Sequence, residues 1–220
     1  MRRLNTTSIR LALAATIGLS MSSAMADDSF STQADGDSFT HSNKYVSFDS
    51  KGNLLRPKNY REWIFAGTGT TPKSVHADVL FPDFQNVYID PVSYQYWKQH
   101  GEFPEGTILV KELIHKGLTD SPVGKGFWQG EYHSLSAAVK SKAKFPNTFK
   151  NWNYFNWTNK VEGVLNETAA PLGERCSSCH IENAAEGTVF YNYFAVLRDS
   201  KGTGEAPENA NTRKGLSKSN

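Results

Sequence analysis

The run Thr107-Ile108-Leu109-Val110-Lys111-Glu112-Leu113-Ile114 predicts a β-strand that is covered on both faces. Because side chains alternate across a strand, Val110 and Glu112 share one face, and Leu109 and Lys111 share the other. Each face is therefore apolar apart from one charge. In the simplest interpretation both charges reach water at a sheet edge, since lysine is rarely fully buried. In the alternative, a desolvated Lys111 loses its proton readily and becomes a nucleophile.

Shorter β-branched or aromatic runs, separated by glycine and proline, predict further strands. They lie at residues 63–65, 86–89, 126–128 and 152–157. Together with residues 107–115 they indicate an antiparallel sheet of at least roughly four or five strands.

Three helices are expected beside these strands. Asp90 as the N-cap and Pro91 at the first helical position predict a helix over residues 92–100 that stops before Gly101. The other two cover residues 134–144 and 188–200. The last has apolar residues at helical spacing that are expected in the core, namely Val189, Phe190, Phe194 and Leu197. The fold class is therefore α+β, an antiparallel β-sheet with a few packed helices.

The N-terminus has the pattern of an export signal. A cationic start, an apolar run over residues 11–19 and small residues up to Ala26 predict a signal peptide, residues 1–26, cleaved after Ala26 for export to the periplasm. The apolar run is too short to cross a bilayer, so no membrane span is expected. We expect a mobile N-terminal lead at 27–43, a single domain at 44–201 and a flexible tail at 202–220.

Composition limits the function classes. The chain has 220 residues, 38% hydrophobic and 21% charged, which suits an ordinary domain. Loss of the three leader arginines, Arg2, Arg3 and Arg10, lowers the net charge from +2 to −1. No basic surplus then remains to neutralise phosphates, and nucleic-acid binding is not expected.

Both cysteines lie in one motif, Cys176-Ser177-Ser178-Cys179-His180. This is C-x-x-C-H, the attachment signature of c-type haem. Two thiols can reach the two vinyl groups of one porphyrin, and the next residue, a histidine, can bind iron. We therefore predict heme c attached through Cys176 and Cys179, with His180 as the iron ligand, near the C-terminal end of the domain.

Other interpretations of the cysteine pair fit less well. A thioredoxin-like redox pair belongs at a helix start early in a βαβ unit, whereas this motif lies near the C-terminus. Structural zinc needs a second ligand pair, and a disulfide across two residues constrains very little of the chain.

The opposite side of the iron cannot be filled by methionine. Met1, Met21 and Met25 all lie within the leader, so the mature chain has none. A second histidine, a lysine or an open position remains. An open position favours ligand chemistry, whereas a histidine there, with His133 as the candidate in a sheet position, indicates an electron carrier.

The chain shares several motifs with one family over nearly all of its mature length. They are Arg56-Pro57-Lys58-Asn59-Tyr60-Arg61-Glu62-Trp63, Val87-Tyr88-Ile89-Asp90-Pro91, Trp97-Lys98, Gly101-Glu102-Phe103, Gly106-Thr107, Val110-Lys111-Glu112-Leu113, the C-x-x-C-H motif, Glu182-Asn183 and Val196-Leu197-Arg198. In these the chain resembles the cytochrome P-460 family of exported monohaem proteins, in which a lysine also bonds to the porphyrin rim.

This resemblance implies a mostly β fold, a homodimer, and oxidation of hydroxylamine towards nitrous oxide, with nitric oxide as a related ligand. A small soluble cytochrome c is a reasonable electron acceptor. By register, the resemblance makes Lys111 the cross-linking lysine, which reverses the interpretation of that residue as reaching water. A bond to the macrocycle would alter the electronics of the haem.

The sequence departs from the family pattern at two positions. Ser136 falls where active members place a carboxylate, and Gln85 falls where they place an arginine. Neither side chain is a useful base at neutral pH. Glu131 or His133 could substitute for the carboxylate if the strand is displaced. The departure favours an alternative function, a cytochrome c-prime-beta-like protein that binds nitric oxide with little or no hydroxylamine turnover.

Overall fold

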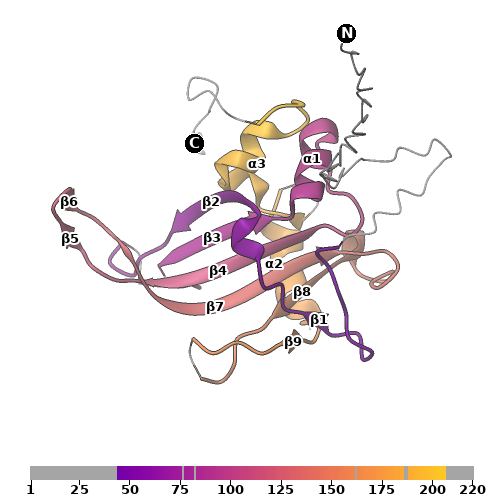
Figure 1. Cartoon of the computed structure of the whole chain (residues 1–220), viewed down its shortest axis with the longest axis horizontal. Coiled ribbons are helices and arrows are strands. Elements are labelled where there is room, and N and C mark those ends of the chain that lie inside the picture. The colour runs from indigo at the N-terminus through magenta and orange to yellow at the C-terminus, as the bar shows by residue number, and fades with distance from the viewer. Residues whose placement is uncertain (1–43, 76, 82, 162, 186–187, 207–220) are drawn as a thin grey trace, which may run out of the picture. The chain divides into compact units, whose positions relative to one another are not determined.

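Five antiparallel strands form the central sheet of the computed structural model, which describes residues 44–75, 77–81, 83–161, 163–185 and 188–206. The order across the sheet (Figure 1) is β2 (Ile64–Thr70), β3 (Phe84–Ile89), β4 (Ile108–Lys116), β7 (Gln129–Lys140) and β8 (Trp152–Asn156). Every neighbouring pair is antiparallel. The predicted α+β fold class is confirmed.

All described residues belong to one unit of the chain, residues 39–220. The signal peptide expected at 1–26, the lead at 27–43 and residues 207–220 of the tail lie outside the described residues. No helix in the described part of the chain is long and apolar enough to cross a membrane.

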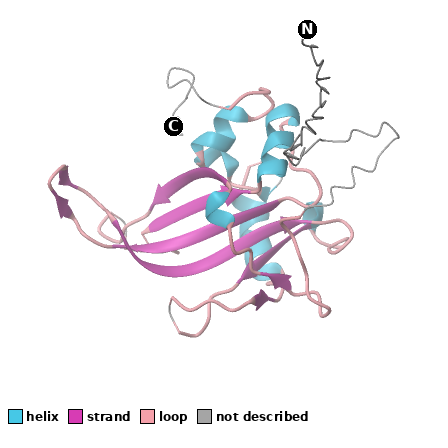
Figure 2. Cartoon of the chain, in the orientation of Figure 1, coloured by secondary structure: helices cyan, strands magenta, loops and turns pink. Residues whose placement is uncertain are grey.

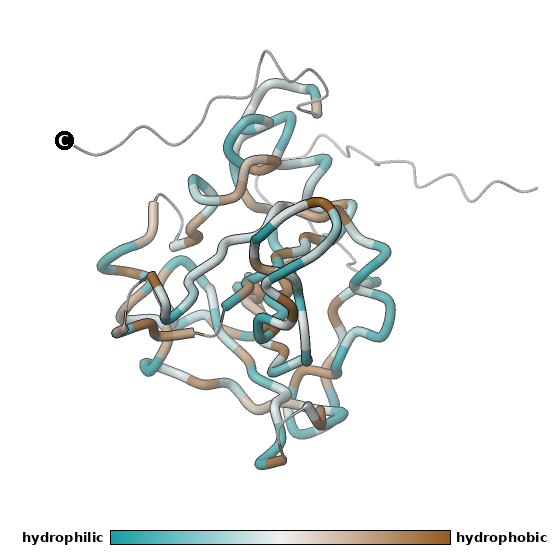
Figure 3. Tube along the Cα trace, turned by 90° about the vertical axis from the view of Figure 1, so that its left-hand side faces the viewer, coloured by the Kyte–Doolittle hydropathy of each residue, from teal (hydrophilic) through white to brown (hydrophobic). Residues whose placement is uncertain are grey.

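Short elements complete the fold, and Figure 2 shows them beside the main sheet. β1 (Leu54–Leu55) pairs with β9 (Thr168–Ala169), and β5 (Asp120–Ser121) pairs with β6 (Gly124–Lys125). The β5–β6 hairpin points toward the viewer in Figure 3. Val123 in its turn and Leu118 just before β5 are exposed hydrophobic residues. The described residues also include the 3-10 turns η1 (Tyr60–Glu62), η2 (Phe149–Asn151) and η4 (Tyr191–Tyr193).

Helix α1 (Pro91–His100) confirms the capping prediction. The Asp90 carboxylate accepts a hydrogen bond from the Ser93 amide at 2.8 Å, and Gly101 ends the helix in the left-handed region, with φ 70°. The other oxygen of Asp90 accepts from the Ile108 amide at 3.1 Å. One buried side chain therefore both begins α1 and fixes it to the first residue of β4.

The sheet is covered on both faces. One face packs in a cluster with Leu54, Trp63 and Trp157. The opposite face packs against Trp97 of α1 and Leu197 of α3 (Ala195–Ser200). The helices α1 and α3 contact each other and lie beyond β2 in Figure 1. Two hydrophobic layers, one on each side, therefore enclose the central strands.

Strand β4 contributes to both layers, as its alternation predicted. Val110 packs in the first cluster and Leu109 in the second. The expectation that Glu112 reaches water at a sheet edge is wrong, because β4 is the middle strand and Glu112 is only 1% exposed. Burial is possible because Tyr60 and Asn86 donate hydrogen bonds to its carboxylate at 2.7 and 3.1 Å, and Arg61 pairs with it.

The helix predicted at residues 134–144 is wrong, because most of this segment belongs to β7. In the structure Leu135, Ala137 and Val139 alternate into the first cluster, while Ser136 points to the other face. Pairing with β4 on one side and β8 on the other overrides the helix propensity of Ala137 and Ala138.

Two further expectations need correction. Residues 126–128 connect β6 to β7 and are not a strand. The helix over 188–200 is divided into η4 and α3, because Thr188 has φ 64° and Phe194 has an extended backbone. Val189 and Leu197 are buried in the second cluster as expected.

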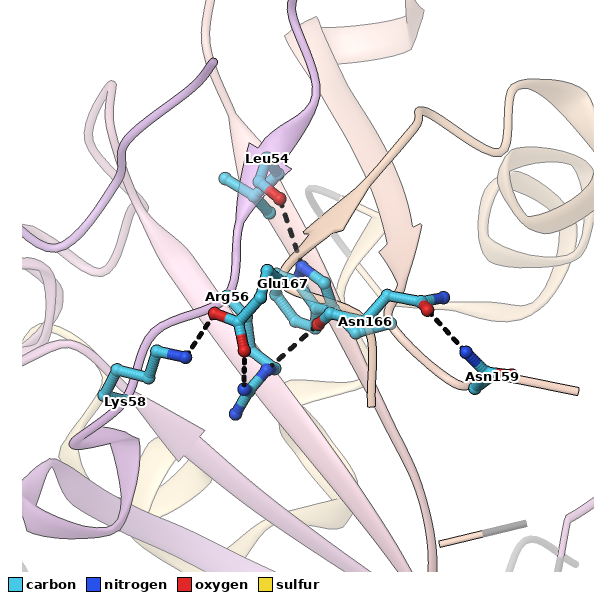
Figure 4. Close-up of polar contacts among 7 residues, drawn as sticks. Leu54, Arg56, Lys58, Asn159, Asn166 and Glu167 are labelled. Carbon is cyan, nitrogen blue, oxygen red and sulfur yellow. Dashed lines mark hydrogen bonds and ion pairs between the residues drawn. The ribbon is translucent and has the colours of Figure 1, made fainter. Parts of the chain in front are cut away.

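Polar contacts join the chain segments around β1 and β9 (Figure 4). Arg56 donates to the Asn166 carbonyl at 3.0 Å and pairs with Glu167 at 2.6 Å, and Lys58 pairs with the same carboxylate. The Trp157 indole donates to the Leu54 carbonyl at 3.1 Å. These contacts close the sheet face opposite α1.

Candidate functional site

Helix α2 (Glu174–Asn183) carries the C-x-x-C-H motif. Its spacing places Cys176, Cys179 and His180 on one side of the helix. Between the cysteines, Ser177 and Ser178 donate hydrogen bonds to carbonyls four residues earlier, at 3.3 and 3.0 Å. The serines are therefore satisfied within the helix, and the thiol-bearing side contains the two free cysteines and the imidazole.

The His180 imidazole is oriented by a backbone carbonyl. Its Nδ1 lies 2.8 Å from the Thr188 carbonyl oxygen, which can only accept, so Nδ1 carries the proton and donates. Nε2 then has its lone pair available for a metal ion. A carbonyl partner of this kind fixes the tautomer and ring angle of metal-ligating histidines.

Thr188 holds this carbonyl in a left-handed backbone conformation, with φ 64°. A β-branched residue rarely adopts such a conformation, which costs free energy. The same carbonyl also accepts from the Tyr154 hydroxyl at 3.4 Å. The carbonyl of this strained residue therefore accepts hydrogen bonds from two side chains of the site, those of His180 and Tyr154.

Two aromatic rings pack against the His180 imidazole. Tyr154 of β8 and Phe190 lie 4.4 and 4.9 Å from it between ring centroids. Burial lowers the pKa of His180, and the charge of Lys111 acts in the same direction. The imidazole is therefore kept in the neutral form that binds metal.

Lys111 lies on the sheet face that carries Tyr154. The register pairs Lys111 with Ser136 and Leu109 with Ala138, and Ala138 pairs with Tyr154 on the next strand. Alternation then places Lys111, Ser136 and Tyr154 on one face. The lysine of the sheet and the histidine of α2 thus face a common region.

Burial lowers the pKa of the Lys111 amine to about 8, and the thiols of Cys176 and Cys179 act in the opposite direction. The amine also lowers the pKa of Cys176, although burial of that thiol raises it more. Lys111 therefore lies close enough to the motif for its charge to influence the two thiols. Its Nζ is 3.6 Å from the centroid of the Phe81 ring.

Ser136 and Gln85 lie in neighbouring rows of the same face. Ser136 is directly opposite Lys111, and Gln85 pairs with Leu113, two residues further along β4. Gln85 donates to the Thr71 hydroxyl at 3.1 Å. Both uncharged side chains are therefore near Lys111, and neither supplies a base there.

An open cleft of about 610 Å³ lies beside Gln85. It is formed by the end of β2, the following loop and the loop before β7, with Thr70, Thr71, Pro72, Val75, Asp78, Val79, Leu80, Phe81, Gln85 and Phe127 as its lining. Phe81 connects this cleft to Lys111. Small molecules could therefore approach the lysine side of the site from solvent.

The residues present fit a c-type haem. No residue of α2 is buried, so its thiol-bearing side is accessible to a porphyrin that would cover it. Two free thiols, an imidazole with Nε2 available and a partly desolvated amine are the groups that such a porphyrin would engage.

Fold and site together define a c-type haem-attachment protein built on an antiparallel sheet. Residues 57–191, more than half of the chain, match the family model described as Cytochrome P460. The chain therefore belongs to the cytochrome P460 family, which implies a c-type haem. No curated protein matches the chain significantly.

Sequence reasoning missed several residues of the site. The role of Thr188 comes from its backbone, which its side chain does not reveal. Phe190 was expected only in the core, and Tyr154 was one residue of an aromatic run. Phe81 carried no signal, because its contact with Lys111 depends on how the loop folds back.

Proposed function

We propose that the protein is a periplasmic haem enzyme that oxidises hydroxylamine towards nitrous oxide. Heme c would be held by Cys176 and Cys179, with His180 on the iron and Lys111 bonded to the porphyrin rim. The observation that carries this proposal is the position of Lys111, desolvated and on the sheet face toward the C-x-x-C-H motif. Members of the family are typically hydroxylamine-oxidising haem enzymes.

Desolvation prepares Lys111 for bond formation, since only the neutral amine is a nucleophile. At pH 7, a pKa of about 8 leaves about a tenth of the amine neutral, against roughly one part in three thousand for the ordinary value of 10.5. A C–N bond that replaces a C–H bond at the porphyrin rim also removes two hydrogen atoms, as two protons and two electrons. An oxidant from outside the chain must accept these electrons.

Thr188 and Tyr154 position the iron ligand in this proposal. The Thr188 carbonyl accepts the Nδ1 proton and so raises the basicity of Nε2. Tyr154 and Phe190 limit rotation of the ring. When bound, the haem would supply an open coordination position for the nitrogen of hydroxylamine and a route for single electrons.

The overall reaction releases protons as well as electrons. Two molecules of hydroxylamine give one nitrous oxide and one water, with four protons and four electrons left over. The electrons require an acceptor, for which a small soluble cytochrome c is suitable. The protons require a base close to the substrate.

The proposed assembly is a homodimer.

The test uses the purified holoprotein with hydroxylamine and a soluble one-electron acceptor under anaerobic conditions. We expect acceptor reduction together with nitrous oxide, at two electrons for each hydroxylamine consumed. The matched control is the same preparation without hydroxylamine. Failure to reduce any acceptor would contradict enzymatic oxidation.

A second candidate function is nitric oxide binding without hydroxylamine turnover. The uncharged Ser136 opposite Lys111 favours it, together with Gln85 at the cleft. Tight nitric oxide binding by a holoprotein that does not oxidise hydroxylamine would select this function. A low-spin ferric spectrum that becomes high-spin in His133→Gln would instead indicate an electron carrier with two histidine ligands.

A further inference from the structure

We propose that His115 and His133 form the proton-accepting pair for this oxidation. The inference rests on the proposed function and deepens it, because it names the group that receives the protons of hydroxylamine. Neither residue binds iron in this account.

The two imidazoles meet across neighbouring strands. His115 is on β4 and His133 is on β7, and their ring centroids are 4.9 Å apart with an angle of 52° between the planes. Both residues are half-buried, so each has access to water as well as to the interior. A proton taken up by one ring can therefore pass to the other and then to solvent.

A β-bulge brings His133 to this position. Leu113 pairs with Ser134, but the next residue of β4, Ile114, pairs with Tyr132, so His133 is the extra residue on β7. A bulge turns a side chain that regular alternation would place on the other face. His133 therefore joins His115 on the face of Ser134.

This face is the one toward the motif. On β4, His115 is two alternations from Lys111, and Leu113 between them is in the same row as Gln85 and Ser134. Gln85 lines the cleft. The pair thus lies at the end of the sheet where the cleft opens, on the same side as Lys111.

The chemistry of the site calls for such a pair. Each two-electron oxidation of hydroxylamine breaks two bonds to hydrogen, and both protons must leave as the electrons pass to the acceptor. The serine and amide near Lys111 cannot accept them at neutral pH. Imidazole can, because the ring nitrogen that carries no hydrogen has a lone pair that accepts a proton.

Charged groups around the pair come from every neighbouring element. Lys111 and Lys116 are on β4, and the Asp83 carboxylate before β3 accepts from the Lys116 amide at 2.7 Å. Glu131 is exposed on β7, and Asp78 lies in the cleft lining. Two lysines and three carboxylates, those of Asp83, Glu131 and Asp78, thus surround the imidazoles.

The test compares the holoproteins of His115→Gln, His133→Gln and the double variant with wild type. We expect kcat for hydroxylamine oxidation to fall roughly 100-fold in the double variant, while KM and the ferrous spectrum stay unchanged. Added imidazole should restore part of the rate to His133→Gly. The matched control is His100→Gln on α1, which should retain wild-type kcat.

A measurement without turnover completes the test. The midpoint potential of the wild-type haem should change with pH, and this change should be smaller in the double variant but not in His100→Gln. If the histidines had only a structural role, their removal would leave this pH dependence unchanged, and added imidazole would not restore the rate.

Three outcomes would overturn the inference. In the first, wild type is active and both the rate and the potential slope persist in the double variant, which leaves the proposed function intact. In the second, the ferric spin state changes in His133→Gln, which makes His133 an iron ligand. In the third, wild type itself does not oxidise hydroxylamine, and the proposed function falls together with the role of the pair.

Discussion

The Thr188 carbonyl oxygen lies 2.8 Å from Nδ1 of His180, and Thr188 holds it there with a φ of 64°. The orientation of the expected iron ligand therefore depends on a backbone conformation eight residues further along the chain. The conformation is costly for threonine, so surrounding contacts must maintain it.

Substitution at Thr188 should separate backbone from side-chain effects. Proline cannot adopt this φ, and Thr188→Pro should displace the carbonyl, lower the basicity of His180 and raise the haem midpoint potential. Asparagine tolerates the left-handed region, so Thr188→Asn should leave the potential near that of wild type. Spectroelectrochemical titration of both holoproteins checks the difference, and equal potentials would contradict the role of the carbonyl.

Glu112 should be critical for stability rather than for chemistry. Glu112→Ala leaves the Tyr60 hydroxyl and the Asn86 amide without their buried carboxylate partner. We expect a loss of about 3 to 5 kcal/mol in the free energy of unfolding. Denaturant titration measures it, with the exposed Glu131→Ala on β7 as the control, for which we expect a change within about 0.5 kcal/mol. A similar loss in both variants would rule out a special contribution of the buried network.

Asp90 should stabilise two elements at once. Its carboxylate accepts from the amides of Ser93 and Ile108, so Asp90→Ala leaves two buried donors without partners. The expected loss is about 2 kcal/mol or more. Asp90→Asn keeps one acceptor oxygen and should lose less. Thermal unfolding of the two variants would contradict this account if Asn and Ala were equally destabilising.

Local patterns in the sequence predicted the parts of the fold that depend on neighbouring residues. Asp90-Pro91 and Gly101 define both ends of α1, and the alternation in residues 107–115 defines β4. Residues 134–144 were misassigned because Ala137 and Ala138 favour a helix locally, while pairing with strands distant in the sequence makes most of the segment a strand. Glu112 was misplaced for the same reason, since Tyr60 and Arg61 lie some fifty residues earlier.

The candidate site shows the same division. The C-x-x-C-H motif is local, so its three residues could be assigned from the sequence. The conformation of Thr188, the bulge at His133 and the contact between Lys111 and Phe81 are products of the folded backbone. Neither residue type nor spacing along the chain predicts these three features.

The most direct test of the account is whether Lys111 is joined to the porphyrin. Intact mass and the absorption spectrum of the ferrous haem should be measured for the native protein and for Lys111→Ala. We expect a native mass lower by two hydrogen atoms than that of the protein with haem held by thioethers alone. We also expect a red-shifted ferrous Soret band that reverts to an ordinary c-type spectrum in the variant. A native mass without the loss of two hydrogen atoms, together with an ordinary c-type spectrum in both proteins, would contradict the bond between Lys111 and the porphyrin.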